Sequence, residues 1–327
     1  MKILVLGASG YLGMRLLDKL AATDWAQATG AARGRRNADG TTSHMRLDIR
    51  NLKALTHALN GYECVVNCVA GDFDSIANGA KTLVRAALDT KCRRIVHLST
   101  MSVYGRTEGR VSEAALFDPQ FGWYARAKCE AELHMTEFAR NGGEVVILRP
   151  GCVFGSGSEL WVGRIGRWLR AGRLGELGAA GDGWSNLVNV DDVCKAILAA
   201  MRLPGTQSGT LVFNLVAPDS PRWNDYFLDL ALAIGATPVR RISARQLKID
   251  SLLAGPPLKV AEKLLDKFGI QHRWLPDALP PSVARLWAQD IRLISQAATD
   301  VLALNWIRYE ASLGECADWL RGCMVSG

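Results

Sequence analysis

Short apolar runs alternate with helical patterns of apolar residues along the first two thirds of the chain. The first run, at residues 3–6, contains no turn residue and is typical of a strand buried on both faces of a sheet. Apolar residues then recur at helical spacing: Tyr11, Leu12, Leu16, Leu17 and Leu20. Further strands are predicted at 27–32, 45–49, 62–69, 94–98, 145–148 and 211–216, and helices at 51–60, 78–88 and 124–138. This alternation predicts an α/β fold with a doubly wound parallel sheet.

Three glycines separate the first strand from the first helix. Gly7, Gly10 and Gly13 follow one another at three-residue spacing. A strand, a glycine turn and a helix hold the pyrophosphate of a dinucleotide: the first glycine makes the turn, the second lets backbone approach phosphate, and the third lets the helix pack on the sheet. The helix N-terminus then offers N–H groups to the anion. The alternative is a turn that binds nothing.

Basic residues follow the second predicted strand. Arg33, Arg35 and Arg36 lie about twenty residues beyond the glycine turn, where a dinucleotide site contacts the adenosine ribose. An NAD site usually places Asp or Glu there, and the first acid in this stretch is Asp39. A guanidinium binds a 2′-phosphate that a carboxylate would repel. The sequence therefore favours NADP(H), with NAD(H) as the second choice and a solvated basic loop as the alternative without function.

Other candidate binding residues follow predicted strands. Asp48 and Ile49 could bracket an adenine edge and face, and the small Ala70 would let a cofactor lie close to the backbone. Thr100 comes at the end of the 94–98 strand, and ligands in such sheets bind beyond the carboxyl ends of strands. Hydroxyls after a strand are also common simply as turn formers.

Tyr124 and Lys128 are four residues apart at the start of a predicted helix, so they share one face. An ammonium near a phenol favours phenolate, and we expect it to lower the tyrosine pKa from about 10. Tyr124 would then serve as a general acid/base near neutral pH. This spacing also occurs by chance, but here it follows the glycine turn and the hydroxyl-bearing strand end in order.

Together these motifs resemble the extended short-chain dehydrogenase/reductase superfamily, which includes NAD-dependent epimerase/dehydratases. The resemblance spans roughly residues 1–216. Its motifs are GASGYLG at 7–13, Asp48-Ile49, STMSVYG at 99–105, Tyr124 with Lys128, Arg149-Pro150-Gly151 and NVDDV at 189–193. It implies a Rossmann-type sheet and a smaller, mostly helical substrate domain.

The resemblance also implies roles for individual residues. Tyr124 would be the catalytic acid/base, Lys128 would bind the nicotinamide ribose and lower the pKa of Tyr124, and Thr100 would hydrogen-bond the reacting oxygen. Pro150 and Val153 would border the nicotinamide. The cofactor-binding set is then Gly7, Ser9, Gly10, Tyr11, Leu12, Gly13, Arg33, Arg36, Asp48, Ile49, Ala70, Tyr124, Lys128, Pro150 and Val153. Members of this superfamily are often dimers, so a homodimer is compatible with the resemblance.

One departure bears on the substrate. Sugar-nucleotide members commonly carry an Arg-Asp pair shortly before the segment that corresponds to 189–193, and the corresponding stretch of this chain, residues 183–188, lacks that Arg, which puts a nucleotide-sugar substrate in doubt. A substrate diphosphate needs cationic partners, which the arginines at 164, 167, 170 and 173 could supply. The leading hypothesis is therefore an NADPH-linked oxidoreductase of a small carbonyl/alcohol pair. The alternatives are a nucleotide-sugar epimerase/dehydratase that recycles its NAD(P), and a non-catalytic NADP-binding protein.

The alternation fades after residue 216, and proline pairs at 256–257 and 280–281 separate helical stretches. We expect residues 1–216 to form the cofactor domain, with part of 151–185 contributing to the substrate site, and residues 217–327 to form the substrate-binding domain. A chain of 327 residues is long enough for both.

The composition argues against three features: a nucleic-acid partner, a membrane span and a metal site. The net charge of +7 comes without a basic, aromatic-rich face, so we expect no nucleic-acid partner. No apolar run reaches the roughly 18 residues of a membrane span. The eight cysteines form no CxxC and no zinc-ligand spacing, so no metal site is expected. Scattered free cysteines in a chain of this size fit the cytoplasm.

Overall fold

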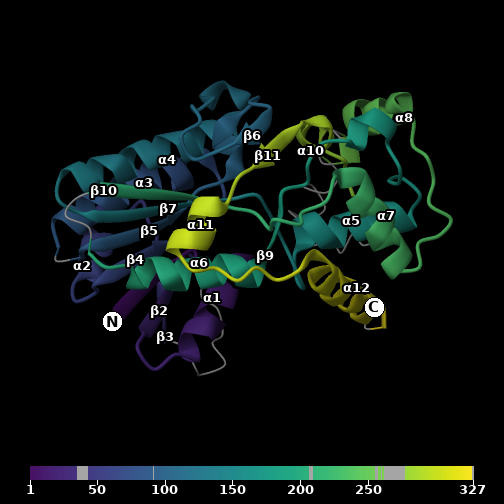
Figure 1. Ribbon diagram of the computed structural model, residues 1–327. Helices are drawn as coiled ribbons and strands as arrows, with labels where there is room; N and C mark the ends of the chain where they lie inside the picture. The colour runs from purple at the N-terminus through teal and green to yellow at the C-terminus, as the bar shows by residue number, and fades with distance from the viewer. Residues whose placement is uncertain are drawn as a thin grey trace. The chain divides into compact units, whose positions relative to one another are not determined.

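Figure 1 shows the computed structural model, which describes residues 1–34, 43–90, 92–205, 209–254, 257–258, 260 and 277–325. The chain divides into two compact units. Unit 1 comprises residues 1–151, 188–216 and 293–306, and unit 2 comprises 152–187, 217–292 and 307–327. The units therefore interleave along the sequence, whereas the predicted domains meet at a single boundary at residue 216.

Seven strands of the described residues form one parallel sheet in unit 1, in the order β10-β7-β5-β4-β1-β2-β3. Their bounds are β1 Lys2–Leu6, β2 Gln27–Ala32, β3 Ser43–Arg46, β4 Cys64–Asn67, β5 Arg94–Leu98, β7 Glu144–Pro150 and β10 Gly209–Leu215. The chain runs outward from β1 to β3 and then crosses back to β4. The strand order thus reverses between β1 and β4, where a doubly wound sheet binds its ligand.

Helices cover both faces of this sheet. In Figure 1, α3 and α4 lie along one face, and α1 and α6 lie along the other. The helices of unit 1 are α1 Tyr11–Ala21, α2 Leu52–Leu59, α3 Phe73–Leu88, α4 Trp123–Arg140, α6 Val190–Arg202 and α11 Gln296–Val301. Leu4, Val65 and Ile95 pack with Leu83 and Met135 on one face of the sheet, and Ile3 and Val5 are fully buried on the other. The apolar run of β1 is therefore buried on both sides, as predicted, and the predicted fold class is confirmed.

Local capping explains where predicted and observed bounds differ. α3 begins at Phe73, five residues before the predicted start, because the Asp72 carboxylate accepts from Ser75 N at 2.7 Å. Asn189 caps α6 by accepting from Asp191 N at 2.8 Å, and Asp191 pairs with Arg15 of α1 at 2.8 Å.

Unit 2 is mostly helical around an aromatic core. Its helices are α5 Arg164–Arg170, α7 Trp223–Ala233, α8 Ala244–Ile249, α10 Pro281–Ala288 and α12 Tyr309–Val325. Trp168, Trp223, Phe227 and Trp287 pack edge-on or tilted, with ring centroids 5.1 to 6.4 Å apart. Four short strands of the described residues lie outside the seven-stranded sheet: β6 Gly109–Val111, which belongs to unit 1, β8 Cys152–Phe154, β9 Leu187–Asn189 and β11 Ile291–Leu293.

Candidate active site

A cavity of about 160 Å³ opens at the carboxyl ends of β1, β2 and β4 in unit 1. It is lined by the ends of these strands, by the glycine turn and by the start of α3. The lining residues are Leu6, Gly7, Ser9, Gly10, Ala31, Ala32, Arg33, Leu47, Ile49, Cys68, Val69, Ala70 and Ser75. The cavity therefore lies beside the reversal point of the sheet, as a dinucleotide site requires.

The glycine turn has the geometry of a phosphate cradle. Gly7 has φ +78°, and a Cβ there would lie 2.8 Å from the backbone of Cys68. A Cβ on Gly13 would lie 2.4 Å from Gly7 O, so only glycine lets α1 approach the turn. Gly10 stands at the N-cap of α1, where no side chain competes for the N–H groups of the first turn. These residues fit the pyrophosphate of a dinucleotide.

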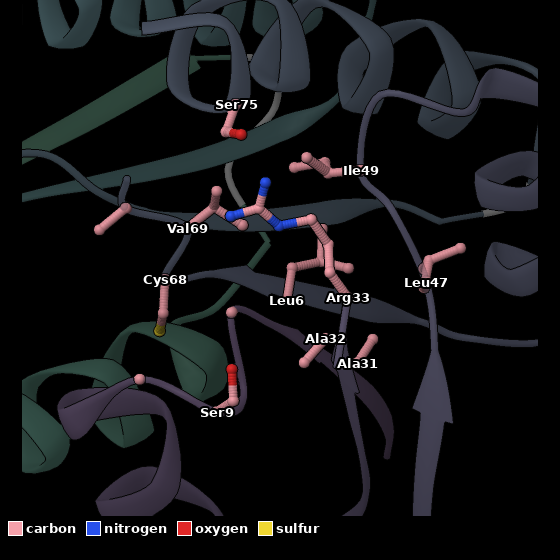
Figure 2. A pocket seen from close by; sticks show the side chains of 13 residues that line it. Leu6, Ser9, Ala31, Ala32, Arg33, Leu47, Ile49, Cys68, Val69 and Ser75 are labelled. Carbon is pink, nitrogen blue, oxygen red and sulfur yellow. The ribbon is translucent and has the colours of Figure 1, made fainter. Parts of the chain in front are cut away.

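Arg33 belongs to the same cavity. Figure 2 shows its side chain reaching across the pocket toward Val69 and Ser75. Ile49 and Leu47 lie on the opposite side of the guanidinium from Val69, to the right in this view. Its Nη1 lies 3.9 Å from the Asp72 carboxylate, and both side chains are 56% exposed. The guanidinium is thus held loosely and can contact a ligand. Arg36, predicted with it, lies outside the described residues, as do Arg35 and Asp39.

Asp48 and Ile49 have different surroundings. Ile49 lines the pocket. The carboxylate of Asp48 instead accepts from Arg50 Nε at 3.0 Å and Nη2 at 2.7 Å, and these hydrogen bonds lower the pKa of Asp48 to about 2. Asp48 is therefore a permanent anion beside Arg50 rather than a member of the pocket wall.

Other predicted cofactor residues are spread more widely. Ser9 and Ala70 line the cavity, while Tyr11, Leu12 and Gly13 form the first turn of α1 and are not among the lining residues. Pro150 is the last residue of β7, in unit 1. Val153 lies in β8, which belongs to unit 2.

The three predicted catalytic residues meet at the carboxyl end of β5. Thr100 follows β5 and caps a 3₁₀ turn, accepting from Ser102 N at 3.2 Å. The half-buried Tyr124 phenol lies near enough to the Thr100 hydroxyl for the two groups to interact. Lys128 lies one turn farther along α4, is 3% exposed, and donates from Nζ to Leu98 O at 2.6 Å and Val69 O at 3.3 Å.

The expected lowering of the Tyr124 pKa is wrong for the protein alone. Burial raises the pKa of Tyr124, and the hydrogen bond with Thr100 works against this rise without cancelling it. The ammonium of Lys128 is engaged by two carbonyl groups, and burial lowers the pKa of Lys128 to about 8. Tyr124 is thus a neutral phenol and Lys128 mostly a cation at pH 7, which suits proton donation by Tyr124.

Behind these residues lies a buried polar network that sequence reasoning missed. Arg149 donates to Glu132 from Nε at 3.0 Å and Nη2 at 2.7 Å. Its Nη1 donates to Tyr104 Oη at 2.9 Å, and Tyr104 Oη donates to Asn214 Oδ1 at 2.6 Å. One signal was present in the sequence: Glu132 is four residues after Lys128, on the helix face of Tyr124.

The pocket residues that were missed also share a signal, because most of them end or follow strands. They are Leu6, Ala31, Ala32, Leu47, Cys68, Val69 and Ser75. Within the described residues, no group of three or more His, Cys, Asp or Glu side chains could hold a metal ion. Across the same part of the chain, no helix is long and apolar enough to cross a membrane.

Comparison with known proteins identifies the family. The model of the NAD dependent epimerase/dehydratase family matches residues 3–215. An N-acetyl-alpha-D-glucosaminyl-diphospho-ditrans,octacis-undecaprenol 4-epimerase of Escherichia coli O157:H7 is 26% identical over 68% of this chain and 68% of that protein. A 2-alkyl-3-oxoalkanoate reductase of Stenotrophomonas maltophilia is 29% identical over 61% of this chain and 64% of that protein.

Among solved structures, UDP-glucuronic acid 4-epimerase from Bacillus cereus in complex with NAD superposes with a TM-score of 0.75. It is 19% identical, and the match covers 99% of each chain. This likeness extends the shared fold over both units. The family match covers well over half of the chain and includes the glycine turn, Thr100, Tyr124 and Lys128. The chain belongs to the NAD-dependent epimerase/dehydratase family, enzymes of the extended short-chain dehydrogenase/reductase type.

Proposed function

We propose that this protein is a nucleotide-sugar epimerase or dehydratase that removes a hydride from a sugar carbon and returns it to the same substrate. The observation that carries the proposal is that Thr100, Tyr124 and the buried Lys128 come together at the carboxyl end of β5, in the same unit as a pocket that fits a dinucleotide. The solved relative named above is an epimerase with NAD. These findings favour this reading over the NADPH-linked reductase that we expected first.

The roles of the residues follow from their geometry. When bound, the nicotinamide accepts and returns the hydride. Tyr124, once ionised to the phenolate, takes up the proton of the substrate hydroxyl and gives it back as the neutral phenol, Thr100 donates a hydrogen bond to the reacting oxygen, and Lys128 supplies a fixed positive charge one helical turn away. The turn at Gly7 and Gly10 binds the pyrophosphate, and Leu47 and Ile49 contact the adenine.

Tyr124→Phe tests this assignment. It removes the proton-transferring hydroxyl, so turnover should fall by about 100-fold or more, while the dissociation constant of NAD stays close to that of the wild type. Turnover is followed by anion-exchange chromatography of UDP-glucose, UDP-glucuronic acid and UDP-N-acetylglucosamine, with absorbance at 340 nm recorded in parallel. Product without net NADH is expected. Near-normal turnover by Tyr124→Phe would remove Tyr124 from the mechanism.

A second candidate is the NADPH-linked reductase, and Arg33 is the observation that favours it. Arg33 extends over the pocket at the end of β2, where a 2′-phosphate would meet its guanidinium. Fluorescence titration with NADPH and NADH decides between the two. Tighter NADPH binding that Arg33→Ala abolishes would favour the reductase, and equal or tighter NADH binding would favour the epimerase with recycled NAD.

The homodimer and the cytoplasmic location stay predictions. The cysteines of the described residues are all free thiols, which supports a reducing compartment. Sedimentation of the purified protein measures the oligomeric state directly.

A further inference from the structure

We propose that Glu132, with its ion-pair partner Arg149, positions the reactive residues by tying the carboxyl end of β5 to the catalytic face of α4. The inference rests on the proposed roles of Thr100, Tyr124 and Lys128. Glu132 and Arg149 themselves are not placed in contact with substrate or cofactor, so theirs is a positioning role.

Consecutive residues at the end of β5 contact consecutive turns of α4. Leu98 O accepts from Lys128 Nζ, Ser99 Oγ donates to Glu132 Oε1, and the Thr100 hydroxyl lies near the Tyr124 phenol. The α4 residues are spaced by four and so lie on one helix face. Ser99 is the residue next to Thr100, so its bond to Glu132 fixes where the Thr100 hydroxyl meets Tyr124.

The Glu132 carboxylate can occupy this place only because Arg149 neutralises it. The two side chains are 2% and 5% exposed and meet at 2.7 Å. Burial is the largest single influence on Arg149 and opposes its charge, but the hydrogen bonds and charge interactions with Glu132 and Tyr104 together outweigh burial and raise the pKa of Arg149 above its ordinary value. A buried carboxylate with several charge-assisted hydrogen bonds is both costly to disturb and precise in its geometry.

Arg149 is in turn held from β10 and from the segment after β5. Tyr104 Oη bonds to both Arg149 and Asn214, while Glu113 O accepts from Arg149 at 3.0 Å. Glu113 Oε1 accepts from Asn214 N at 2.9 Å, which closes the ring of contacts. β5, β7 and β10 are neighbours in the sheet. The network therefore fixes Glu132 against the carboxyl ends of three adjacent strands.

Glu132 also acts on Lys128 through its charge. The titratable groups that face Lys128 are Glu132 and Tyr124 from α4, Cys68 after β4 and His97 of β5. Burial raises the pKa of the Cys68 thiol to about 12 and lowers the pKa of His97 well below its ordinary value, so both are neutral at pH 7. Of these four groups Glu132 is then the anion near Lys128, and it favours the protonated amine.

The test compares Glu132→Gln and Ser99→Ala with a matched control, Glu144→Gln. Glu144 forms a part-buried ion pair with Arg94 at the opposite end of β5 and β7. The first readout is the pKa of Lys128 from NMR of protein with ¹³C-labelled lysine, assigned by comparison with Lys128→Met. It needs no substrate. We expect Glu132→Gln to lower this pKa by about one unit and Glu144→Gln to leave it unchanged.

The second readout is kcat against KM with whichever UDP-sugar the wild type converts. Ser99→Ala should lower kcat about tenfold or more, because small misplacements of reacting groups are costly, with little change in KM. Ser99→Thr keeps the hydroxyl and should therefore recover part of the kcat that Ser99→Ala loses. Ser295→Ala is the serine control: Ser295 Oγ donates to Val216 O within unit 1, and its loss should leave kcat unchanged.

The outcomes separate the two proposals. If Glu132→Gln does not fold, Glu132→Asp keeps the charge and withdraws the carboxylate from Ser99, so it should behave like Ser99→Ala in kcat and like the wild type in the Lys128 pKa. The positioning role would be overturned if the folded Glu132 and Ser99 variants kept the wild-type kcat and the wild-type Lys128 pKa, or if Glu144→Gln changed both quantities as much as they do. If turnover is then still lost in Tyr124→Phe, the proposed function stands without the positioning role.

Discussion

β5 and β7 have a largely buried ion pair at each end, and the two pairs differ in what they contact. At the amino end, Arg94 Nη2 lies 2.6 Å from Glu144 Oε2, and Arg94 Nη1 donates to Met201 O at 2.6 Å near the end of α6. At the carboxyl end, the Glu132–Arg149 pair contacts Ser99, which precedes Thr100. The first pair satisfies a helix C-terminus, whereas the second contacts the direct neighbour of a reactive residue. Both pairs hold charges largely out of solvent, so the contacts of each pair distinguish their roles.

The largest expected effect comes from removing one partner at the carboxyl end. Arg149→Met leaves the Glu132 carboxylate buried without a counterion, which should lower the free energy of unfolding by about 3–5 kcal/mol. Urea denaturation followed by circular dichroism measures this. The double variant Glu132→Gln/Arg149→Met should regain much of the loss because no unpaired charge is left. A loss below about 1 kcal/mol in Arg149→Met would show that the network is weaker than its geometry indicates.

The next effect concerns Lys128 and depends on pH. Its pKa is lowered from 10.5 to about 8 by burial, so the unfolded chain binds more protons than the folded protein between these pH values. Stability from this group therefore rises as pH increases from about 8 to 10.5, by up to about 3 kcal/mol. We expect the free energy of unfolding of the wild type to rise by up to about 3 kcal/mol relative to that of Lys128→Met between pH 8 and pH 10.5. Urea titrations under reducing conditions measure this difference. A difference that does not change with pH would contradict the lowered pKa.

A smaller effect is expected at the amino end. Glu144→Gln removes the charge partner of Arg94, whose side chain is 11% exposed, and should cost about 1–3 kcal/mol of stability. Its kcat should stay within about twofold of the wild type, since the pair contacts no reactive residue. If kcat fell as much in Glu144→Gln as in Ser99→Ala, the ion pairs at the two ends of β5 and β7 would not differ in their effect on catalysis.

Much of unit 1 could be predicted from the sequence because its signals are local. The apolar runs of β1 and β5, the glycine turn and the Tyr124–Lys128 spacing depend only on neighbouring residues. The pKa of Tyr124 could not be predicted from the sequence, because it depends on how deeply the phenol is buried and on which carbonyl groups accept hydrogen bonds from Lys128. The partners of Glu132 were also hidden, because Ser99, Arg149 and Asn214 meet only when three strands align.

Helix capping gives the smallest effect and a further contrast between the two edges of the sheet. α6 begins at the carboxyl edge with Asn189 as its cap and ends near Arg94 at the amino edge. Asn189→Ala should lower the free energy of unfolding by about 1 kcal/mol, because the Asp191 N–H loses its acceptor. Asp191→Ala removes part-exposed ion pairs with Arg15 and Lys19 and should cost about 0–1 kcal/mol. Parallel thermal melts compare the two variants. If Asp191→Ala were clearly the more damaging, the ion pairs between α1 and α6 would outweigh the cap in holding this helix.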